Sequence, residues 1–271
     1  MAVPTDLDTF EIKLLEHGVA VITFNRPNRY NALNPQVYAQ WGKALEWAAK
    51  SEDVRVVVLT GNGKYYSSGQ ELAIPDSSEL EEAGGPEGVF KKRGVHTRKV
   101  ISELIHFPKL IIAAVQGPAI GFSVTSSALC DVVYATPEAT FNTPFMQFEA
   151  CSSVVLPRVM GYSRANEMLL MGRKFTAEEM KEAGVVARIF PKENFMEQVL
   201  KLATEAAKFP PQAMKDTKGL IRDIDTKLLD EVSDREMTLL GVRMSSEESA
   251  QAIMEFMMAK HDRKEKTLSK L

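Results

Sequence analysis

Two near-continuous apolar segments constrain the fold of this chain more than any other feature. Residues 54–60 read VRVVVLT, residues 109–116 read KLIIAAVQ, and a loop that contains glycine follows each of them. Strands of this kind are typically buried on both faces, as in parallel sheets. A third short strand is expected at 131–135, and a long helix at 90–105. This alternation of strands and helices predicts an α/β domain.

The residues before the first apolar segment predict a pair of strands followed by a helix. Residues 10–16 and 19–24 have strand character, and the intervening His17 and Gly18 are expected to form the turn. Asn34 is a good helix N-cap, and the proline that follows it suits the first helical position. Apolar residues then recur at helical spacing, at Val37, Trp41, Leu45 and Ala48.

The rest of the chain is expected to be mostly helical. Residues 76–87 are acidic and rich in serine and glycine, which favours a mobile surface loop. Beyond residue 135, only 185–190 has strand character. We therefore predict a core at 1–205 and a helical C-terminal region at 206–271.

Composition excludes several classes of function. The formal net charge is −3, so no basic excess favours nucleic acid as a partner. The apolar run at 110–115 is too short to span a membrane. Two cysteines and four histidines show no metal-ligand spacing, and the fingerprints of dinucleotide and phosphate loops are absent. We expect no metal site and no nicotinamide cofactor, which leaves acid–base chemistry by carboxylates and backbone dipoles.

Two junctions between a strand and a loop are the candidate sites for that chemistry. Residues 65–72 follow the first apolar strand, and residues 117–123 follow the second and lead into a helix. Glycines at both junctions allow a ligand to approach the backbone closely, and N–H groups at a helix start are unpaired. Two such N–H groups that converge would form an oxyanion hole. The alternative is that these glycines only permit tight turns.

The motifs around these junctions resemble those of the crotonase (enoyl-CoA hydratase/isomerase) superfamily, over nearly the whole chain. The peroxisomal Δ3,Δ2-enoyl-CoA isomerases, especially fungal ones, are the most similar branch. The matching motifs are NRPNRYNALN at 25–34, SSGQEL at 67–72, QGPAIG at 116–121, ALCDVVYA at 128–135, PRVMG at 157–161, ANEMLLMG at 165–172 and FTAEEMKEAG at 175–184. The resemblance implies a crotonase-type spiral of ββα units with a helical C-terminal trimerisation region.

The same resemblance implies how substrate is bound. The oxyanion hole falls on the backbone N–H groups of Gln70 and Phe122, and the substrate is an acyl-CoA thioester. No cofactor is implied, because coenzyme A is part of the substrate. The implied substrate-binding residues are Arg29, Ser68, Gly69, Gln70, Glu71, Leu72 and Gly121.

The resemblance also implies which carboxylate acts. Hydratases of the family use two glutamates, but the corresponding positions here are Thr125 and Phe145. The isomerase branch uses one acid, which falls on Glu149, although the stretch between Pro144 and Glu149 is shorter than the family pattern. The implied reaction shifts the double bond of a 3-enoyl-CoA to give a 2-enoyl-CoA.

Three alternatives stay open from the sequence. The first is a 2-enoyl-CoA hydratase or a dienoyl-CoA isomerase, for which Glu71 is the nearby second acid. The second is a role in specialised acyl-chain metabolism with the same chemistry. The third is an acyl-CoA-binding protein without catalytic activity.

The C-terminal region carries two further predictions. The chain ends in Ser269, Lys270 and Leu271, a tripeptide that an import receptor reads as a peroxisomal address. Apolar residues recur at helical spacing at Leu228, Leu229, Val232, Met237 and Leu240, followed by Met254, Met257 and Met258. We therefore expect a peroxisomal homotrimer, or a hexamer of two trimers, that assembles through residues 206–260.

Overall fold

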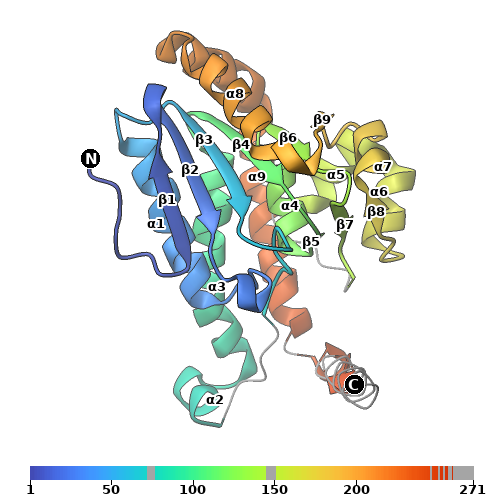
Figure 1. Ribbon diagram of the computed structural model, residues 1–271. Helices are drawn as coiled ribbons and strands as arrows, with labels where there is room; N and C mark the ends of the chain where they lie inside the picture. Colours follow the sequence, from blue (N-terminus) through green and yellow to red (C-terminus); the bar gives the residue numbers. More distant parts are fainter. Residues whose placement is uncertain are drawn as a thin grey trace, which may run out of the picture.

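A six-stranded sheet forms the centre of the protein (Figure 1). The computed structural model describes residues 1–71, 77–144 and 151–244, and beyond them residues 246–249, 251–252, 254–255 and 258. The strand order is β1-β2-β3-β4-β6-β9; β1 is antiparallel to β2, and the other neighbours are parallel. The strands are β1 (Phe10–Leu14), β2 (Val19–Phe24), β3 (Val56–Gly61), β4 (Leu110–Val115), β6 (Val132–Ala135) and β9 (Arg188–Ile189). The predicted parallel α/β sheet is confirmed.

Both faces of the sheet are covered, as the continuous apolar runs predict. Val57 and Leu59 of β3 belong to the core cluster that contains α1 (Pro35–Lys50) and α3 (Pro86–Ile105). Val56 and Val58 point to the other face, where they pack with α8 (Phe195–Ala207). Side chains alternate between faces along a strand, so a strand covered on both sides needs apolar residues at every position.

The first helix begins as the sequence predicts. The side chain of Asn34 accepts a hydrogen bond of 2.9 Å from the N–H of Val37, and Pro35 occupies the first helical position. Trp41 and Trp47 are both buried. The predicted turn before β2 is also present, as a short 3-10 segment, Glu16–Gly18, in which His17 and Gly18 have positive φ.

The prediction of a surface loop at 76–87 is wrong. Residues Ser77–Ala83 form the helix α2, and α3 already begins at Pro86. Ion pairs join α2 to α3, because Glu79 pairs with Arg93 and Glu82 pairs with Lys92. The acidic residues that suggested a loop are therefore the ones that attach a short helix to its neighbour.

A second, three-stranded sheet includes two strands, β7 (Thr140–Asn142) and β8 (Phe175–Thr176), in the region beyond residue 135 that was expected to be helical apart from 185–190. Its third strand is β5 (Ala119–Ile120). β5 pairs with β7 in parallel, and β7 pairs with β8 antiparallel. Strands of two or three residues are too short to produce a recognisable alternation of apolar and polar residues. The remaining helices are α4 (Phe122–Ala128), α5 (Ser152–Met160), α6 (Tyr162–Leu169), α7 (Ala177–Glu182) and α9 (Pro211–Met244).

The long helix α9 packs its apolar stripe inside the protomer. Leu229, Met237 and Leu240 are buried in the main core, and Val232 packs against it. These residues were expected to mediate assembly, so that part of the prediction is wrong. The apolar side chains that α9 does expose are Leu220, Ile221 and Ile224 near its start and Leu239, Val242 and Met244 near its end.

The domain division at 205–206 falls inside α8 and stays a prediction. Within the described part of the chain, no helix is both long and apolar enough to cross a membrane.

Candidate active site

The two glycine-bearing junctions lie at one edge of the central sheet. Because β3 and β4 are parallel, with Val56 opposite Leu110, their carboxyl ends face the same side. In open α/β sheets, this is the edge where ligands bind. Two isolated bridges extend the pairing beyond the strands, between Ser67 and Ala119 and between Leu33 and Gln70. The first junction therefore runs between the loop before α1 and the start of the second junction.

Gly69 and Gly121 fit positions that other residues would not. Gly69 has a φ of 75°, and a Cβ atom there would lie 2.3 Å from the carbonyl oxygen of Ile120. Gly121, with φ 60° and ψ −126°, immediately precedes α4. An L-residue adopts such positive φ angles only at a cost in strain. These glycines bring the two junctions into direct contact, beyond what a tight turn alone requires.

Gln70 at the first junction and Phe122 at the second each have a backbone N–H group without an acceptor among the described residues. In the bridge to Leu33, the carbonyl of Gly69 and the N–H of Glu71 make the hydrogen bonds, which leaves the N–H of Gln70 outside the pairing. Phe122 is the first residue of α4, where N–H groups have no partner within the helix. Neither N–H donates to any acceptor in the described residues. Two unpaired donors on junctions that touch each other could form an oxyanion hole.

Tyr38 of α1 contacts both donor residues, and the sequence did not indicate it. Its hydroxyl donates a hydrogen bond of 2.9 Å to Oε1 of Gln70. Its ring meets the ring of Phe122 edge to face, with centroids 5.3 Å apart and planes at 78°. Tyr38 and Phe122 are both buried. A tyrosine on the buried face of an amphipathic helix has no pattern that distinguishes it from core.

Two amides hold the surrounding loops together. Asn31 has a left-handed backbone, and its Nδ2 donates to the carbonyl oxygens of Asn62, Tyr65 and Tyr66. Gln116, immediately before the second junction, accepts from the N–H of Gly61 and donates to the carbonyl oxygen of Tyr65 at 2.8 Å. Several of the motif residues thus fix the path of the first junction.

The predicted substrate-binding residues differ in their surroundings. Arg29 is exposed, in the short 3-10 segment Pro27–Arg29, and Ser68 donates its N–H to the carbonyl oxygen of Tyr30. Glu71 pairs with Arg26 at 3.1 Å, with both side chains partly buried. Leu72 lies outside the described residues.

Glu149 and Phe145, like the predicted targeting residues Ser269, Lys270 and Leu271, lie outside the described residues. Thr125, which replaces a hydratase glutamate, is buried in α4, and its hydroxyl donates to the carbonyl oxygen of Phe122 at 3.2 Å.

The two cysteines are poorly suited to nucleophilic chemistry. Cys130 and Cys151 are both buried, and burial raises the pKa of each thiol to about 12. A thiol of this kind is protonated at neutral pH and therefore unreactive. Across the described residues, no group of three or more histidine, cysteine, aspartate or glutamate side chains is arranged to hold a metal ion.

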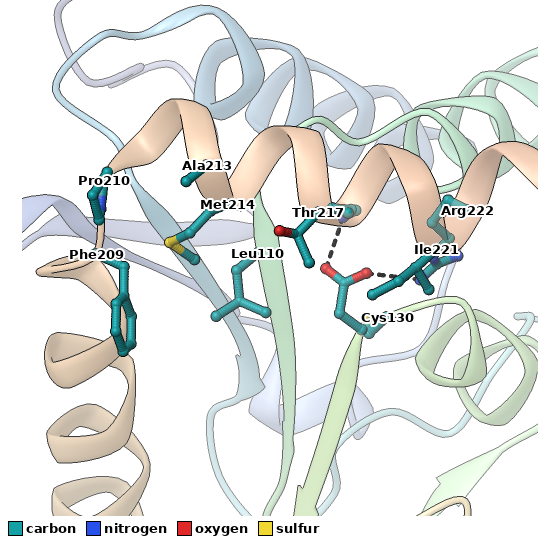
Figure 2. Close-up of a pocket in the computed structure, with 11 residues that line it drawn as sticks. Leu110, Cys130, Phe209, Pro210, Ala213, Met214, Thr217, Ile221 and Arg222 are labelled. Atoms are coloured by element: carbon teal, nitrogen blue, oxygen red, sulfur yellow. Dashed lines mark hydrogen bonds and ion pairs between the residues drawn. The ribbon is translucent and has the colours of Figure 1, made fainter.

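A pocket of about 480 Å³ lies elsewhere, between the start of α9 and the start of β4 (Figure 2). It contains none of the predicted site residues. Its two cations, Lys218 and Arg222, are both paired with Asp131, at 2.7 and 2.9 Å. Asp131 also accepts from the N–H of Ile111, so this cluster attaches α9 to the sheet.

Solved structures place this arrangement of sheets and helices in the crotonase fold class. An enoyl-CoA hydratase/isomerase from Pseudoalteromonas atlantica superposes with a TM-score of 0.80 at 29% identity, over 93% of this chain and 98% of the other. An enoyl-CoA hydratase from Mycobacterium avium subsp. paratuberculosis gives a TM-score of 0.81 at 25% identity, over 93% of this chain and 97% of the other. Residues 15–265 match the family described as enoyl-CoA hydratase/isomerase. The chain belongs to this family.

Three of the similar proteins are named enoyl-CoA delta isomerases. Enoyl-CoA delta isomerase 2 of Rattus norvegicus is 41% identical over 90% of this chain, and its human counterpart is 39% identical over the same share. The chain spans 62% of the length of each of these two proteins. Peroxisomal enoyl-CoA delta isomerase 3 of Mus musculus is 38% identical, over 90% of this chain and 77% of its own length.

Proposed function

We propose that this protein is an enoyl-CoA isomerase that converts 3-enoyl-CoA into 2-enoyl-CoA. The observation that carries the proposal is the pair of adjacent junctions at which the N–H groups of Gln70 and Phe122 have no acceptor among the described residues. The enzymes named enoyl-CoA delta isomerase, at about 40% identity, support the same conclusion.

The reaction moves one proton within the substrate. The carboxylate of Glu149 removes a proton from C2 of the 3-enoyl thioester, and the electrons delocalise into a dienolate. Negative charge develops on the thioester oxygen, where the N–H groups of Gln70 and Phe122 stabilise it. The protonated Glu149 then delivers the proton to C4, which leaves the double bond between C2 and C3 and regenerates the carboxylate.

The surroundings of Thr125 favour isomerisation over hydration. Hydration requires one group to activate water and another to protonate the substrate, and the family's hydratases use two glutamates. The hydroxyl of Thr125 is engaged by the backbone of its own helix and has no acidic proton to exchange near neutral pH. Phe145 carries no acid at the second position.

The ion pair of Glu71 argues against a dienoyl-CoA isomerase. That reaction needs a second acid, and Glu71 is the candidate at this edge of the sheet. Its carboxylate already pairs with Arg26, whose Nη1 also donates to the carbonyl oxygen of Ala32. Glu71 thus joins two loops, which is a structural role that a proton shuttle would disrupt.

Coenzyme A binding is assigned to the rim of the same site. The exposed Arg29 is the cation that meets a CoA phosphate, and the backbone at 68–72 and Gly121 contact the pantetheine and thioester. The reaction requires no cofactor beyond the coenzyme A of the substrate.

Location and assembly complete the proposal. Residues 269–271 direct the protein to peroxisomes through an import receptor, in keeping with the peroxisomal relative from Mus musculus. The protein assembles into a homotrimer or a hexamer of two trimers. The exposed apolar residues Leu220, Ile221 and Ile224 of α9 supply a contact surface for this assembly.

A direct test uses 3-hexenoyl-CoA and 2-hexenoyl-CoA as separate substrates of the full chain. We expect 3-hexenoyl-CoA to give the conjugated 2-enoyl product and 2-hexenoyl-CoA to gain no water at a comparable rate. Hydration of 2-hexenoyl-CoA without isomerisation would assign the protein to the hydratases. Binding of both thioesters without turnover of either would make it an acyl-CoA-binding protein.

A further inference from the structure

Glu236 of α9 is a buried acid that the proposed chemistry does not use. Its carboxylate faces the start of α5, where Oε2 accepts the N–H of Cys151 at 2.9 Å. Oε1 accepts the N–H of Ser153 at 2.9 Å and the hydroxyl of Ser153 as well. Glu236 is only 5% exposed, so these contacts are shielded from water.

The contact is unusual because the cap comes from a distant part of the chain. Helix N-termini carry N–H groups without partners, and a nearby side chain ordinarily satisfies them. Here the acceptor lies 83 residues beyond Ser153. Burial raises the pKa of Glu236, and the hydrogen bonds from Ser153 and Cys151 act in the opposite direction. Keeping an acid in this place therefore has a desolvation cost that only the contacts with residues 151–153 offset.

The same contacts hold Cys151 in a strained conformation. Cys151 has φ 61° and ψ 23°, in the left-handed region that a non-glycine residue adopts only at a cost in strain. Its N–H is bound by Glu236, and its thiol donates to the carbonyl oxygen of Leu229, another α9 residue. α9 thus fixes both the backbone and the side chain of this one residue.

Cys151 follows the proposed catalytic acid by two residues. Consecutive Cα atoms are about 3.8 Å apart, so a residue held rigidly restricts where the chain two positions earlier can lie. We propose that Glu236 is a positioning residue, which fixes the C-terminal end of the segment that contains Glu149 and thereby sets the place of the catalytic carboxylate. This inference rests on the proposed isomerase function.

A cap with a purely structural role would give a different result from a positioning residue. Loss of a cap lowers the free energy of unfolding but leaves the turnover of the folded enzyme intact. Loss of a positioning residue lowers kcat in the folded enzyme. KM should stay unchanged, because the substrate contacts at Gln70, Phe122 and Arg29 come from other segments.

The test is Glu236→Gln in the full-length protein, assayed with 3-hexenoyl-CoA. Glutamine keeps the size of the side chain, but its NH2 group cannot accept the N–H of Cys151. We expect kcat to fall about tenfold to hundredfold, as for a displaced catalytic group, with KM within about twofold of wild type. Amide hydrogen exchange at residues 151–153 should accelerate. Glu231→Gln, on the exposed side of the same helix, is the matched control. It should change neither kcat nor the amide exchange at residues 151–153.

A second variant keeps the test decisive if Glu236→Gln folds poorly. Ser153→Ala removes one donor and leaves both backbone hydrogen bonds to Glu236, so a several-fold loss of kcat at constant KM is expected. Suppose that the wild type is active and that both variants show faster amide exchange but the kcat of the wild type. Glu236 would then be only a helix cap, and the inference would be overturned. A wild type without isomerase turnover would instead refute the proposed function itself.

Discussion

The hydroxyl of Tyr38 donates a hydrogen bond of 2.9 Å to Oε1 of Gln70, while the Tyr38 ring packs edge to face on Phe122. One buried side chain of α1 therefore touches both residues whose backbone N–H groups form the proposed oxyanion hole. The Gln70 side chain cannot rotate freely while this bond is present. Its backbone is held separately by the bridge to Leu33. Tyr38 thus couples the two halves of the site.

Tyr38→Phe should reduce isomerase activity moderately. The substitution removes the hydrogen bond to Gln70 and keeps the ring against Phe122. A net hydrogen bond contributes about 0.5–1.5 kcal/mol, so kcat/KM for 3-hexenoyl-CoA should fall about two- to tenfold. Tyr162→Phe, at a tyrosine that is 77% exposed on α6, provides the control and should leave kcat/KM unchanged. If Tyr38→Phe keeps the same kcat/KM as Tyr162→Phe, the hydrogen bond from Tyr38 to Gln70 does not contribute to catalysis.

Arg29→Ala should weaken substrate binding without slowing the chemistry. A contact with a CoA phosphate, far from the reacting carbons, stabilises the ground state and the transition state equally. An exposed ion pair contributes up to about 1 kcal/mol, so KM should rise about two- to fivefold at unchanged kcat. The rise should shrink at high salt. Lys201→Ala on α8 is the control and should leave KM unchanged. An equally unchanged KM in Arg29→Ala would mean that Arg29 is a solvated surface residue.

The central sheet could be predicted because its strands are buried on both faces. Residues such as Val56, Val57 and Val58 must be apolar whichever face they point to, and this leaves an unbroken apolar run in the sequence. The strands β7 and β8 leave no such run, because they have only three and two residues. The helix α2 was missed because its ion-pair partners, Lys92 and Arg93, lie in the next helix, and a local pattern of acidic residues does not reveal them.

The candidate site could be predicted where it depends on backbone conformation. The glycines at 69 and 121 mark positions with positive φ and indicated the two junctions, whereas the donors Gln70 and Phe122 came from the family resemblance and stay a prediction. Side chains from distant elements could not be predicted. Glu236 interrupts an apolar stripe on α9, which was the one available signal, but its partners lie 83 and 85 residues earlier in the chain.

The assembly prediction now points to a different part of α9. Because Leu229, Met237 and Leu240 are buried within the protomer, the exposed start of α9 is the better candidate for a contact between copies. Ile224 is 84% exposed. Light scattering at micromolar concentration should give three or six times the protomer mass. Ile224→Glu should lower that mass, whereas Lys201→Glu on α8 should not. A wild-type protein with the mass of one protomer would contradict the prediction.

Targeting can be tested apart from catalysis. Deletion of Leu271 removes the last residue of the address that the receptor reads. Fluorescence microscopy should show the full chain in peroxisomes and the shortened chain in the cytosol, while the purified shortened protein keeps its isomerase activity. Unchanged peroxisomal import of the shortened chain would show that another signal directs it.

The kcat of Glu149→Gln on 3-hexenoyl-CoA tests the central claim most directly. Glutamine keeps the size and shape of the side chain but cannot take up and return a proton. General acid–base catalysis contributes about 10²–10⁴-fold, so kcat should fall by that factor, with substrate affinity nearly unchanged because the oxyanion donors are main-chain groups. Near-normal turnover by Glu149→Gln would contradict the account, and Glu71→Gln would then identify whether the other carboxylate at this edge carries the proton.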